Sequence, residues 1–309
     1  MPQHPQIVVI GGASLDIKGR LRRDFLPGTS NAASVQISVG GVARNIAENL
    51  VRLGLSTALI CAVCGDDFGR SILSQTEAAG VDMGAVMLTC DQRSAAYIAL
   101  LSPDGTMLAG LDDSQTARLI SPDWIDQHAS LLTRAAMVVI DANTSRQTAD
   151  HIVALCDRAK VPVAFDAVAV GLADRYRERV GNFTFVTGSE LEAEVLAGMS
   201  ISDVASATAA AQHLITQGTK LAVIALGQGG VVYATPDEVG HVPPIEAEIV
   251  DPTGAGEALA AMIIYGLVND IPVAECVRLG VVAASLTSSS PETVAPDLSL
   301  EQVYATLET

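Results

Sequence analysis

The chain has 309 residues, close to the size at which one hydrophobic core stops growing, so a single domain over residues 1–309 is expected rather than two equal ones. Hydrophobic residues make up 49% and charged residues 17%, a composition that allows a sizeable core and argues against intrinsic disorder. The 35 acidic and 18 basic side chains give a formal net charge of -17, which disfavours nucleic acid and anionic membrane surfaces as partners.

The N-terminal segment predicts neither export nor membrane insertion. The opening MPQHPQIVVIGG has no basic stretch followed by a long apolar one, and no window approaches the uninterrupted apolar length of a membrane span. We therefore expect a cytoplasmic protein.

Apolar, β-rich runs then alternate with helical patterns. The runs are QIVVIG (6–11), TALICAVC (57–64), AAMVVID (135–141), VPVAFD (161–166), FTFVTG (183–188) and LAVIALG (221–227). Helices are predicted over about 42–53 and 69–79, and the part after residue 252 is predicted to be mainly helical. Continuous apolar strands between amphipathic helices are typical of a mostly parallel sheet covered on both faces. The predicted fold is doubly wound α/β.

Two segments break this alternation. ASVQISVGG (33–41) alternates apolar and polar residues, and RSAAYIALLSPDGTMLAGLDD (93–113) contains an SPDG turn that predicts a hairpin. We expect strands within about 14–40 and 93–113 to form a small β lid. Its exposed strand edge favours pairing with a second copy of the chain, so a homodimer through the lid is predicted.

Cys61 and Cys64 form a C-x-x-C motif, which is found in redox pairs and in zinc sites. No second C-x-x-C or paired histidine completes a zinc site. A buried strand position is the favoured interpretation.

The segment DPTGAGE (251–257) predicts a glycine turn that opens a helix. Pro252 disfavours helix before it, Thr253 can cap the helix, and Gly254 and Gly256 allow close backbone approach. The helix N-terminus would favour an anion such as a phosphoryl group, with Glu257 in the first turn. Alternatively, Glu257 only stabilises the helix dipole and the glycines only pack.

The segment SVGGVARNIAENLVRLG (38–54) is a second glycine turn before an amphipathic helix. Asn45 falls in the first helical turn, where its amide could donate to and accept from a sugar hydroxyl. A plain N-terminal helix with a glycine turn is the alternative.

Polar residues follow the predicted strands, where open parallel sheets bind their ligands. They are Asp16, Asp141, Asn143, Asp166, Thr187, Ser189, Glu192 and the segment GQGG (227–230). The α/β class also suggests an NAD-dependent oxidoreductase, but VIGGASLD lacks G-x-G-x-x-G.

Together these segments resemble the ribokinase-like carbohydrate and nucleoside kinases of the PfkB family. GGVARNIAENLVRLG (40–54) is similar to the family's N-terminal signature, and DPTGAGE to its C-terminal signature D-T-x-G-A-G-D. GGASLD (11–16), CGDDFGRSIL (64–73) and ALGQGGVVY (225–233) add to a resemblance that spans about the whole chain. Within the family the chain is most similar to pseudouridine kinases, through GGVARNIAENL, SAAYIALLSPDGTMLAGLDD, IDANTS and PDLSLEQV.

The resemblance implies an acceptor site for a nucleoside or sugar. Its expected residues are Asp16, Gly41 and Asn45 for the ribose hydroxyls, Ser94 and Tyr97 for the lid, Asp112 or Asn143 for the base, and Asp166 near the phosphates. The implied reaction is transfer of the ATP γ-phosphoryl group to a primary hydroxyl, most simply the 5′-hydroxyl of pseudouridine, with ribokinase-like or adenosine kinase-like acceptors as alternatives.

The resemblance also implies ATP, Mg²⁺ and K⁺ as cofactors. Thr187, Ser189, Gly227 and Gly229 would border ATP, Glu192 would position Mg²⁺ through water, and Asp251 and Thr253 would bind K⁺. Gly254, Ala255 and Gly256 would supply the backbone donors of an anion hole, and Glu257 would be the catalytic base.

Two positions depart from the family pattern. Glu257 stands where the family has aspartate, and the extra methylene moves the carboxylate by about 1 Å, a displacement that can cost about a hundredfold in rate. The family's N-x-x-E is SELE (189–192) here, so Ser189 replaces an amide. A catalytically weakened nucleoside-binding sensor therefore remains as an alternative to an active kinase.

Overall fold

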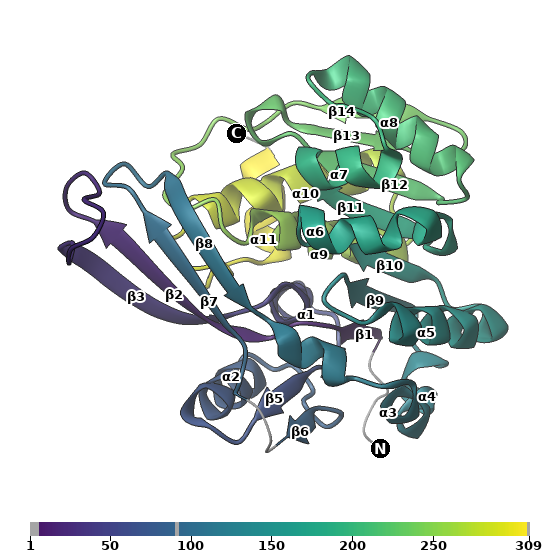
Figure 1. The fold of residues 1–309 in the computed structure, drawn as a ribbon. Helices are drawn as coiled ribbons and strands as arrows, with labels where there is room; N and C mark the ends of the chain where they lie inside the picture. Colours follow the sequence, from purple (N-terminus) through teal and green to yellow (C-terminus); the bar gives the residue numbers. More distant parts are fainter. Residues whose placement is uncertain (1–5, 90–92, 308–309) are drawn as a thin grey trace.

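The computed structural model describes residues 6–89 and 93–307. Its centre is an eight-stranded sheet with helices on both faces, and four further strands project to one side as an arm (Figure 1). The predicted α/β class, with a large and mostly parallel sheet between helices, is confirmed. None of the helices in these ranges combines the length and apolarity needed to cross a membrane.

The central sheet has the strand order β14-β13-β12-β11-β10-β9-β1-β4. Its strands are β1 (Ile7–Ile10), β4 (Thr57–Ile60), β9 (Met137–Asp141), β10 (Val163–Asp166), β11 (Phe185–Ser189), β12 (Leu221–Ala225), β13 (Val231–Ala234) and β14 (Val239–Val242). The six strands from β4 to β12 run parallel, whereas β13 and β14 are antiparallel. Strands β1, β4, β9 and β10 are buried at every position, as a sheet covered on both faces requires.

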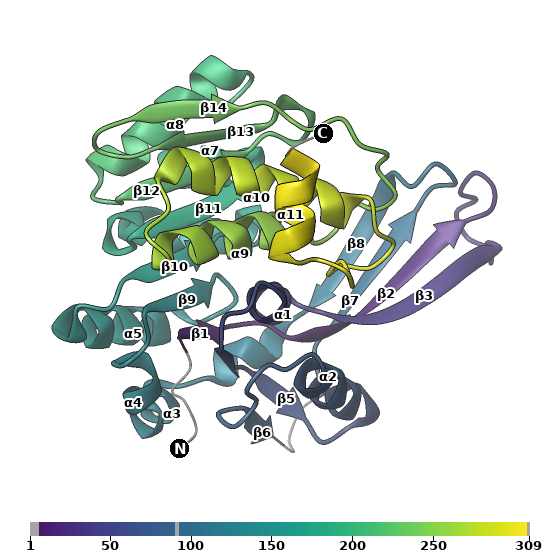
Figure 2. The same cartoon turned by 180° about the vertical axis from the view of Figure 1, so that it is seen from behind.

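Helices cover the two faces of this sheet (Figure 2). One face carries α1 (Val42–Arg52), α9 (Ala255–Val268), α10 (Val273–Ser288) and α11 (Leu300–Leu307). The other carries α3 (Pro122–Gln127), α4 (Ala129–Leu132), α5 (Arg146–Ala159), α6 (Val170–Ala173), α7 (Glu190–Ala197) and α8 (Val204–Thr216). Successive side chains of a strand point to opposite faces, so Ile7 and Val9 join one core and Val8 and Ile10 the other.

The projecting arm is a four-stranded sheet of order β3-β2-β7-β8, which we call the lid sheet. Its strands are β2 (Ser14–Leu21), β3 (Ala33–Gly40), β7 (Ala96–Leu101) and β8 (Met107–Asp113). β7 and β8 pair antiparallel, as the SPDG turn predicted, and Gly105 in that turn has a φ of +92° that favours glycine.

The run TALICAVC divides into two strands instead of forming one. β5 (Ala62–Cys64) leaves the central sheet after β4 and pairs with β6 (Met87–Thr89), beside α2 (Asp67–Ala78). Burial raises the pKa of the Cys61 thiol to about 12, so it stays protonated at neutral pH. Nor do three or more His, Cys, Asp or Glu side chains gather as a metal site anywhere in the described ranges. The C-x-x-C motif therefore belongs to the buried core.

Candidate active site

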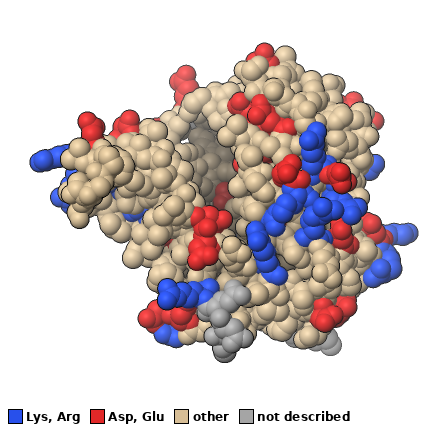
Figure 3. Space-filling model, in the orientation of Figure 1, with Lys and Arg blue, Asp and Glu red and all other residues tan. Residues whose placement is uncertain are grey.

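A cavity of about 1030 Å³ lies at the carboxyl ends of the parallel strands, between the main body and the lid sheet. Figure 3 shows it as a hollow between the arm and the body, with acidic side chains at its lower end. Most of the predicted site residues line it, namely Asp16, Gly41, Asn45, Tyr97, Asp112, Asn143, Asp166, Thr187, Ser189, Glu192, Gly227, Thr253, Gly254, Ala255, Gly256 and Glu257. Its volume is at the upper end of small-molecule sites, which leaves room for two substrates.

The N-terminus of α9 opens onto this cavity. Gly254 is the N-cap residue with a φ of +91°, and a Cβ placed on it would lie 1.8 Å from the carbonyl oxygen of Thr293. Only glycine fits at this position. The first N–H groups of a helix have no partner within it and carry a partial positive charge, so this wall suits an anion.

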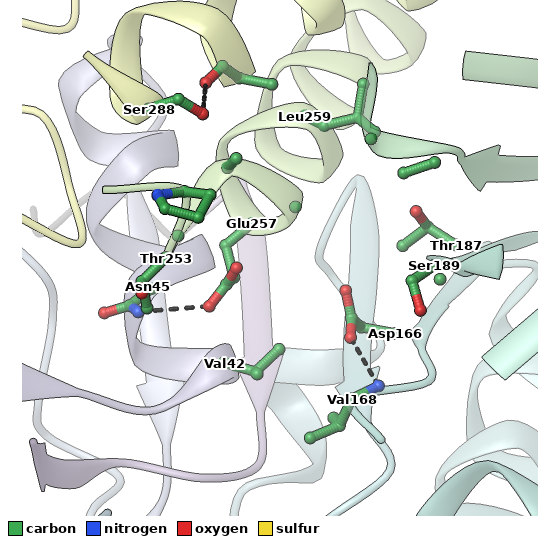
Figure 4. A pocket seen from close by; sticks show the side chains of 18 of the residues that line it. Val42, Asn45, Asp166, Val168, Thr187, Ser189, Thr253, Glu257, Leu259 and Ser288 are labelled. Atoms are coloured by element: carbon green, nitrogen blue, oxygen red, sulfur yellow. Dashed lines mark hydrogen bonds between the residues drawn. The ribbon is translucent and has the colours of Figure 1, made fainter. Parts of the chain in front are cut away.

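Glu257 lies in the first turn of α9 and faces α1 across the cavity. Asn45 Nδ2 donates to Glu257 Oε1 over 3.3 Å (Figure 4). Arg44 Nη1 in turn donates to Asn45 Oδ1 over 3.0 Å. The Arg44 contact orients the amide, because the oxygen must face the guanidinium and the NH₂ group must therefore face Glu257. Arg44 is itself paired with Glu48. A buried network thus fixes one side of the carboxylate.

Asp166 points into the cavity from the opposite wall to Glu257 (Figure 4). Its Oδ1 accepts the N–H of Val168 over 2.9 Å. Burial raises the pKa of Asp166 well above the usual value, and the charge of Glu257 raises it further. Burial also raises the pKa of Glu257. Two carboxylates that face each other in a buried cavity favour a bound cation or proton between them.

We expect Asp166→Asn to stabilise the protein at pH 8, by about 1–2 kcal/mol in urea unfolding. The folded state raises the pKa of Asp166, so the wild type binds this proton more tightly when folded; that stabilisation is present below the unfolded-state pKa and is lost as the pH rises through the folded-state pKa. Asparagine retains an oxygen for Val168 and carries no charge. The gain should vanish near pH 4, and an equal gain at pH 4 and pH 8 would contradict this explanation.

The lid sheet contributes one cross-strand row to the cavity. Asp16 on β2 pairs with Tyr97 on β7, and Tyr97 pairs with Asp112 on β8, so the three side chains lie on one face of the sheet. Ser14 Oγ donates to Asp16 Oδ1 over 2.9 Å. Burial raises the pKa of Asp16, although the Ser14 hydrogen bond and the positive charges of Lys18 and Arg44 act to lower it. A row of acceptors and one phenol suits a ligand with several hydroxyl groups.

Asp141 organises the floor of the site. Its carboxylate accepts the N–H groups of Gly12 over 2.8 Å, Ala43 over 3.1 Å and Asn143 over 2.9 Å, which ties β9 to the turn after β1 and to the start of α1. Asn143 Nδ2 also donates to Asp141 Oδ2 over 3.3 Å and lines the cavity. Asp141 followed a predicted strand, yet nothing in the sequence indicated this bridging role.

The glycine pair before α1 has a packing role as well. Gly41 has a φ of +96°, and a Cβ on it would lie 2.6 Å from Ala13 Cα. A Cβ on Gly40 would lie 2.1 Å from Asp16 Oδ2. The pair therefore lets β2 and Asp16 approach the start of α1, which gives both glycines a packing role, and Gly41 also lines the cavity.

Ser189 and Glu192 form a capping box at the start of α7. The Ser189 N–H donates to Glu192 Oε2 over 2.6 Å, and the Ser189 hydroxyl donates to the same oxygen. Both residues still line the cavity, together with Thr187 at the end of β11. Glu192 thus stabilises its own helix in this structure, and a metal would have to share this carboxylate.

Three predicted residues lie outside the cavity lining, and Ser94 and Gly229 are two of them. Ser94 precedes β7 and is buried against Asp66, with its Oγ donating to Asp66 Oδ1 over 2.6 Å and its N–H donating to Oδ2 over 2.9 Å. Asp66 is the N-cap residue of α2, so Ser94 secures that helix rather than facing an acceptor. Gly229 lies in a turn where its carbonyl oxygen contacts His241 Nε2 over 2.7 Å. Gly227, Gln228 and Gly230 line the cavity instead.

Asp251 also lies outside the cavity lining, and its surroundings do not fit the potassium site expected there. Lys18 Nζ lies 2.6 Å from Asp251 Oδ2, where a potassium ion would have to bind. The second oxygen, Oδ1, accepts the N–H of Thr253 over 2.9 Å. A side-chain ammonium therefore occupies the place that the resemblance assigned to K⁺. Lys18 was not predicted as a site residue, although it follows Asp16 by the two positions that keep a strand residue on the same face.

The charged side chains that line the cavity are all acidic. They are Asp16, Asp112, Asp166, Glu192, Glu246 and Glu257, and no Lys, Arg or His joins them in the described lining. A polyphosphate can bind there only with a cation and with backbone donors such as those of α9. Carboxylates that leave most ligand positions to phosphate and water suit Mg²⁺.

The fold and this cavity define an α/β protein with a lid, an acidic cleft and a helix N-terminus suited to an anion. The sequence profile of the pfkB family carbohydrate kinases matches residues 4–299. The chain belongs to the pfkB family of carbohydrate kinases, which are phosphotransferases with hydroxyl acceptors.

Similar proteins that are named kinases match nearly the whole chain. The chain is 31% identical to a pseudouridine kinase of Escherichia coli (strain K12), covering 100% of this chain and 98% of that protein. It is 26% identical to a guanosine-inosine kinase of Exiguobacterium acetylicum, covering 95% and 98%. An Arabidopsis thaliana ribokinase complexed with ribose and ATP superposes with a TM-score of 0.84 at 22% identity, covering 99% and 100%, and shares the fold.

Proposed function

We propose that this protein is an ATP- and Mg²⁺-dependent kinase that phosphorylates the 5′-hydroxyl of a nucleoside, with pseudouridine as its acceptor. The observation that carries this proposal is the position of Glu257. Its carboxylate lies in the first turn of the helix whose N-terminus can bind a phosphoryl group, and it faces Asn45, a candidate ligand of a sugar hydroxyl. A base, an anion site and a sugar-binding amide are thus brought together in one cavity.

In the proposed reaction the acceptor hydroxyl lies between Glu257 and the backbone of Gly254, Ala255 and Gly256. Glu257 accepts the hydroxyl proton as the oxygen attacks the γ-phosphorus of ATP, and the bond from phosphorus to the leaving ADP oxygen breaks. The N–H groups of α9 stabilise charge on the transferred group. The lid row of Asp16, Tyr97 and Asp112 holds the acceptor and excludes water.

Magnesium, when bound, neutralises charge on the ATP phosphates. Asp166 and Glu192 are the carboxylates proposed to hold it, with Glu192 acting through water. The buried carboxylate of Asp166 supports this role, since a nearby cation would favour its ionised form. Thr187, Ser189 and Gly227 are proposed to border the nucleotide.

The choice of pseudouridine rests on the E. coli relative, and the guanosine-inosine kinase supports nucleosides more generally. Asp112 and Asn143 are proposed to contact the base from the lid and from the end of β9. Asn143 donates to Asp141 with its amide, so its oxygen is available to accept from a base N–H.

ADP formation with Mg-ATP tests this function against a panel of pseudouridine, uridine, adenosine, guanosine, inosine and ribose. Pseudouridine is expected to give a kcat/KM at least about tenfold above the others, because its C-linked base carries an N1–H that uridine lacks, and a site that bonds this N–H rejects acceptors without it. Phosphorus NMR should place the product phosphate on the 5′-oxygen, and EDTA should abolish turnover. A higher kcat/KM for ribose would overturn the nucleoside assignment.

A nucleoside-binding sensor is the second candidate. The observation that favours it is the capping box, which engages Ser189 and Glu192 with each other at the position proposed for the nucleotide and metal. Calorimetry distinguishes the two: tight nucleoside binding without ADP formation from any acceptor supports the sensor.

We also propose that the protein is a homodimer through the lid sheet. The face of the lid turned away from the cavity has an apolar row, since Ile17 pairs with Ile37 and Ile98, and Ile98 pairs with Leu111. Ile37, Ile98 and Leu111 are 62%, 42% and 63% exposed. An uncharged row on a chain of net charge -17 suits a second copy of the same row.

In sedimentation velocity the wild type should be a dimer and Ile98→Glu a monomer; a monomeric wild type would refute the proposal.

A further inference from the structure

Lys18 is a buried cation at the border between the lid and the main body. It lies on β2, on the same face as Asp16, and is 6% exposed. The chain has three lysines, and the other two, Lys160 and Lys220, are exposed. Burying an ammonium is costly unless it is paired, so the position of Lys18 requires a partner.

That partner belongs to the loop that leads into α9. Lys18 Nζ lies 2.6 Å from Asp251 Oδ2, and the two side chains are 7% and 14% exposed. Burial alone would raise the pKa of Asp251, but the Lys18 hydrogen bond holds it below the usual value. Arg20, next on the same face of β2, donates to the Val250 carbonyl over 3.5 Å. The strand therefore contacts this loop through two residues on the same face, Lys18 and Arg20.

The loop transmits this contact to the anion-binding helix N-terminus. Asp251 Oδ1 accepts the Thr253 N–H over 2.9 Å, and Gly254 follows as the N-cap residue of α9. The N–H groups of Val250 and Asp251 donate to the Ser288 carbonyl over 2.8 and 3.1 Å, which holds the other side of the loop. Displacing Asp251 would therefore move the residues that present their N–H groups to a phosphoryl group.

Lys18 also supplies positive charge that the cavity lining lacks. Burial raises the pKa of Asp16 and of Glu257, and Lys18 is among the groups that oppose this rise at both carboxyl groups. A fixed ammonium behind the lining thus lies among Asp16, Asp251 and Glu257, where an acidic cleft must accept an anionic substrate.

We propose that Lys18 is a positioning residue that serves as a built-in monovalent cation: its ammonium holds the loop at Asp251 and fastens lid strand β2 to the anion site. An ammonium carries the same unit charge as a potassium ion. Because it belongs to the Lys18 side chain, it cannot dissociate from the protein. This inference rests on the proposed kinase function. It implies turnover that is independent of potassium.

The kinetic test compares the wild type with Lys18→Ala and with the matched control Lys220→Met, which removes an exposed lysine. The wild type and the control should keep their rates when tetramethylammonium replaces potassium. Lys18→Ala should lower kcat on the order of tenfold to a hundredfold with a smaller change in the nucleoside KM, because the anion site is displaced. Added K⁺ or NH₄⁺ should raise the kcat of Lys18→Ala several-fold, since the shortened side chain leaves space for an ion. A wild type that loses most of its rate in tetramethylammonium, or a Lys18→Ala variant that keeps the wild-type rate, would overturn the proposal.

Hydrogen exchange of the protein without substrates gives a test that does not depend on turnover. In Lys18→Met, which keeps an apolar stem and removes the charge, amides of 14–21 and of 250–254 should both exchange faster than in the wild type and in Lys220→Met. Unchanged exchange in both segments would show that Lys18 does not fasten them. If the wild type phosphorylates no nucleoside, the proposed function fails, and this exchange result alone decides the role of Lys18 as the fastening between lid and loop.

Discussion

Glu257→Gln is expected to lower kcat by about 10²–10⁴-fold, the usual contribution of a general base, while the nucleoside KM changes little. Glutamine matches the shape of Glu257, and its oxygen can still accept from Asn45 Nδ2, so the cavity is preserved while the proton acceptor is lost. Steady-state ADP formation with pseudouridine measures the loss, and calorimetry checks that the nucleoside still binds.

The pH profile distinguishes the loss of a base from a structural effect. Burial raises the pKa of Glu257, so kcat/KM of the wild type should fall with decreasing pH at a point above the ordinary glutamate range. Below its pKa Glu257 holds the proton and cannot accept another. The residual activity of Glu257→Gln should lack this decline. A variant with full activity, or with the wild-type pH profile, would exclude Glu257 as the base.

Glu257→Asp shows whether the site is built for the longer side chain. Aspartate withdraws the carboxylate by about 1 Å and gives up the 3.3 Å contact with Asn45, so a decrease of about tenfold to a hundredfold is expected. A rate increase would mean the opposite, that the surrounding residues are arranged for aspartate and that glutamate weakens this enzyme.

Gly254→Ala is expected to destabilise the protein by about 3 kcal/mol, as measured by urea unfolding. The φ of +91° disfavours any Cβ, and this one would lie 1.8 Å from the Thr293 carbonyl oxygen, so the loop or the chain around Thr293 must move. The rate of phosphoryl transfer should fall along with the stability, because Gly254 sets the start of the helix whose N-terminus is proposed to bind the phosphoryl group.

Gly256→Ala is the matched control in the same turn. A Cβ there meets no atom within 4 Å, and alanine is a better helix former than glycine, so stability should stay the same or rise by a few tenths of a kcal/mol. Activity should fall if the ATP phosphates approach this backbone as proposed. Equal destabilisation by the two substitutions would contradict the steric explanation for Gly254.

Local patterns were sufficient for most of the fold. The strand runs, the helix from Val42 and the hairpin around Gly105 could be predicted because side-chain periodicity and turn residues act over a few neighbouring positions. The division of TALICAVC into β4 and β5 could not, because a continuous apolar run does not record where a chain leaves one sheet for another.

By itself the sequence determined the α/β class, the family and the positions of the glycine turns, since these depend on local periodicity and on short motifs of neighbouring residues. Only the tertiary structure decided which side chains meet. Asn45 reaches Glu257 across 212 positions of the chain, and Lys18 reaches Asp251 across 233. Pairings of this kind depend on how the lid, α1 and α9 pack together. A buried charge is costly unless it is paired, and this packing decides which oppositely charged group lies close enough. For this reason Asp251, which the motif indicated as a potassium ligand, is bound by a lysine.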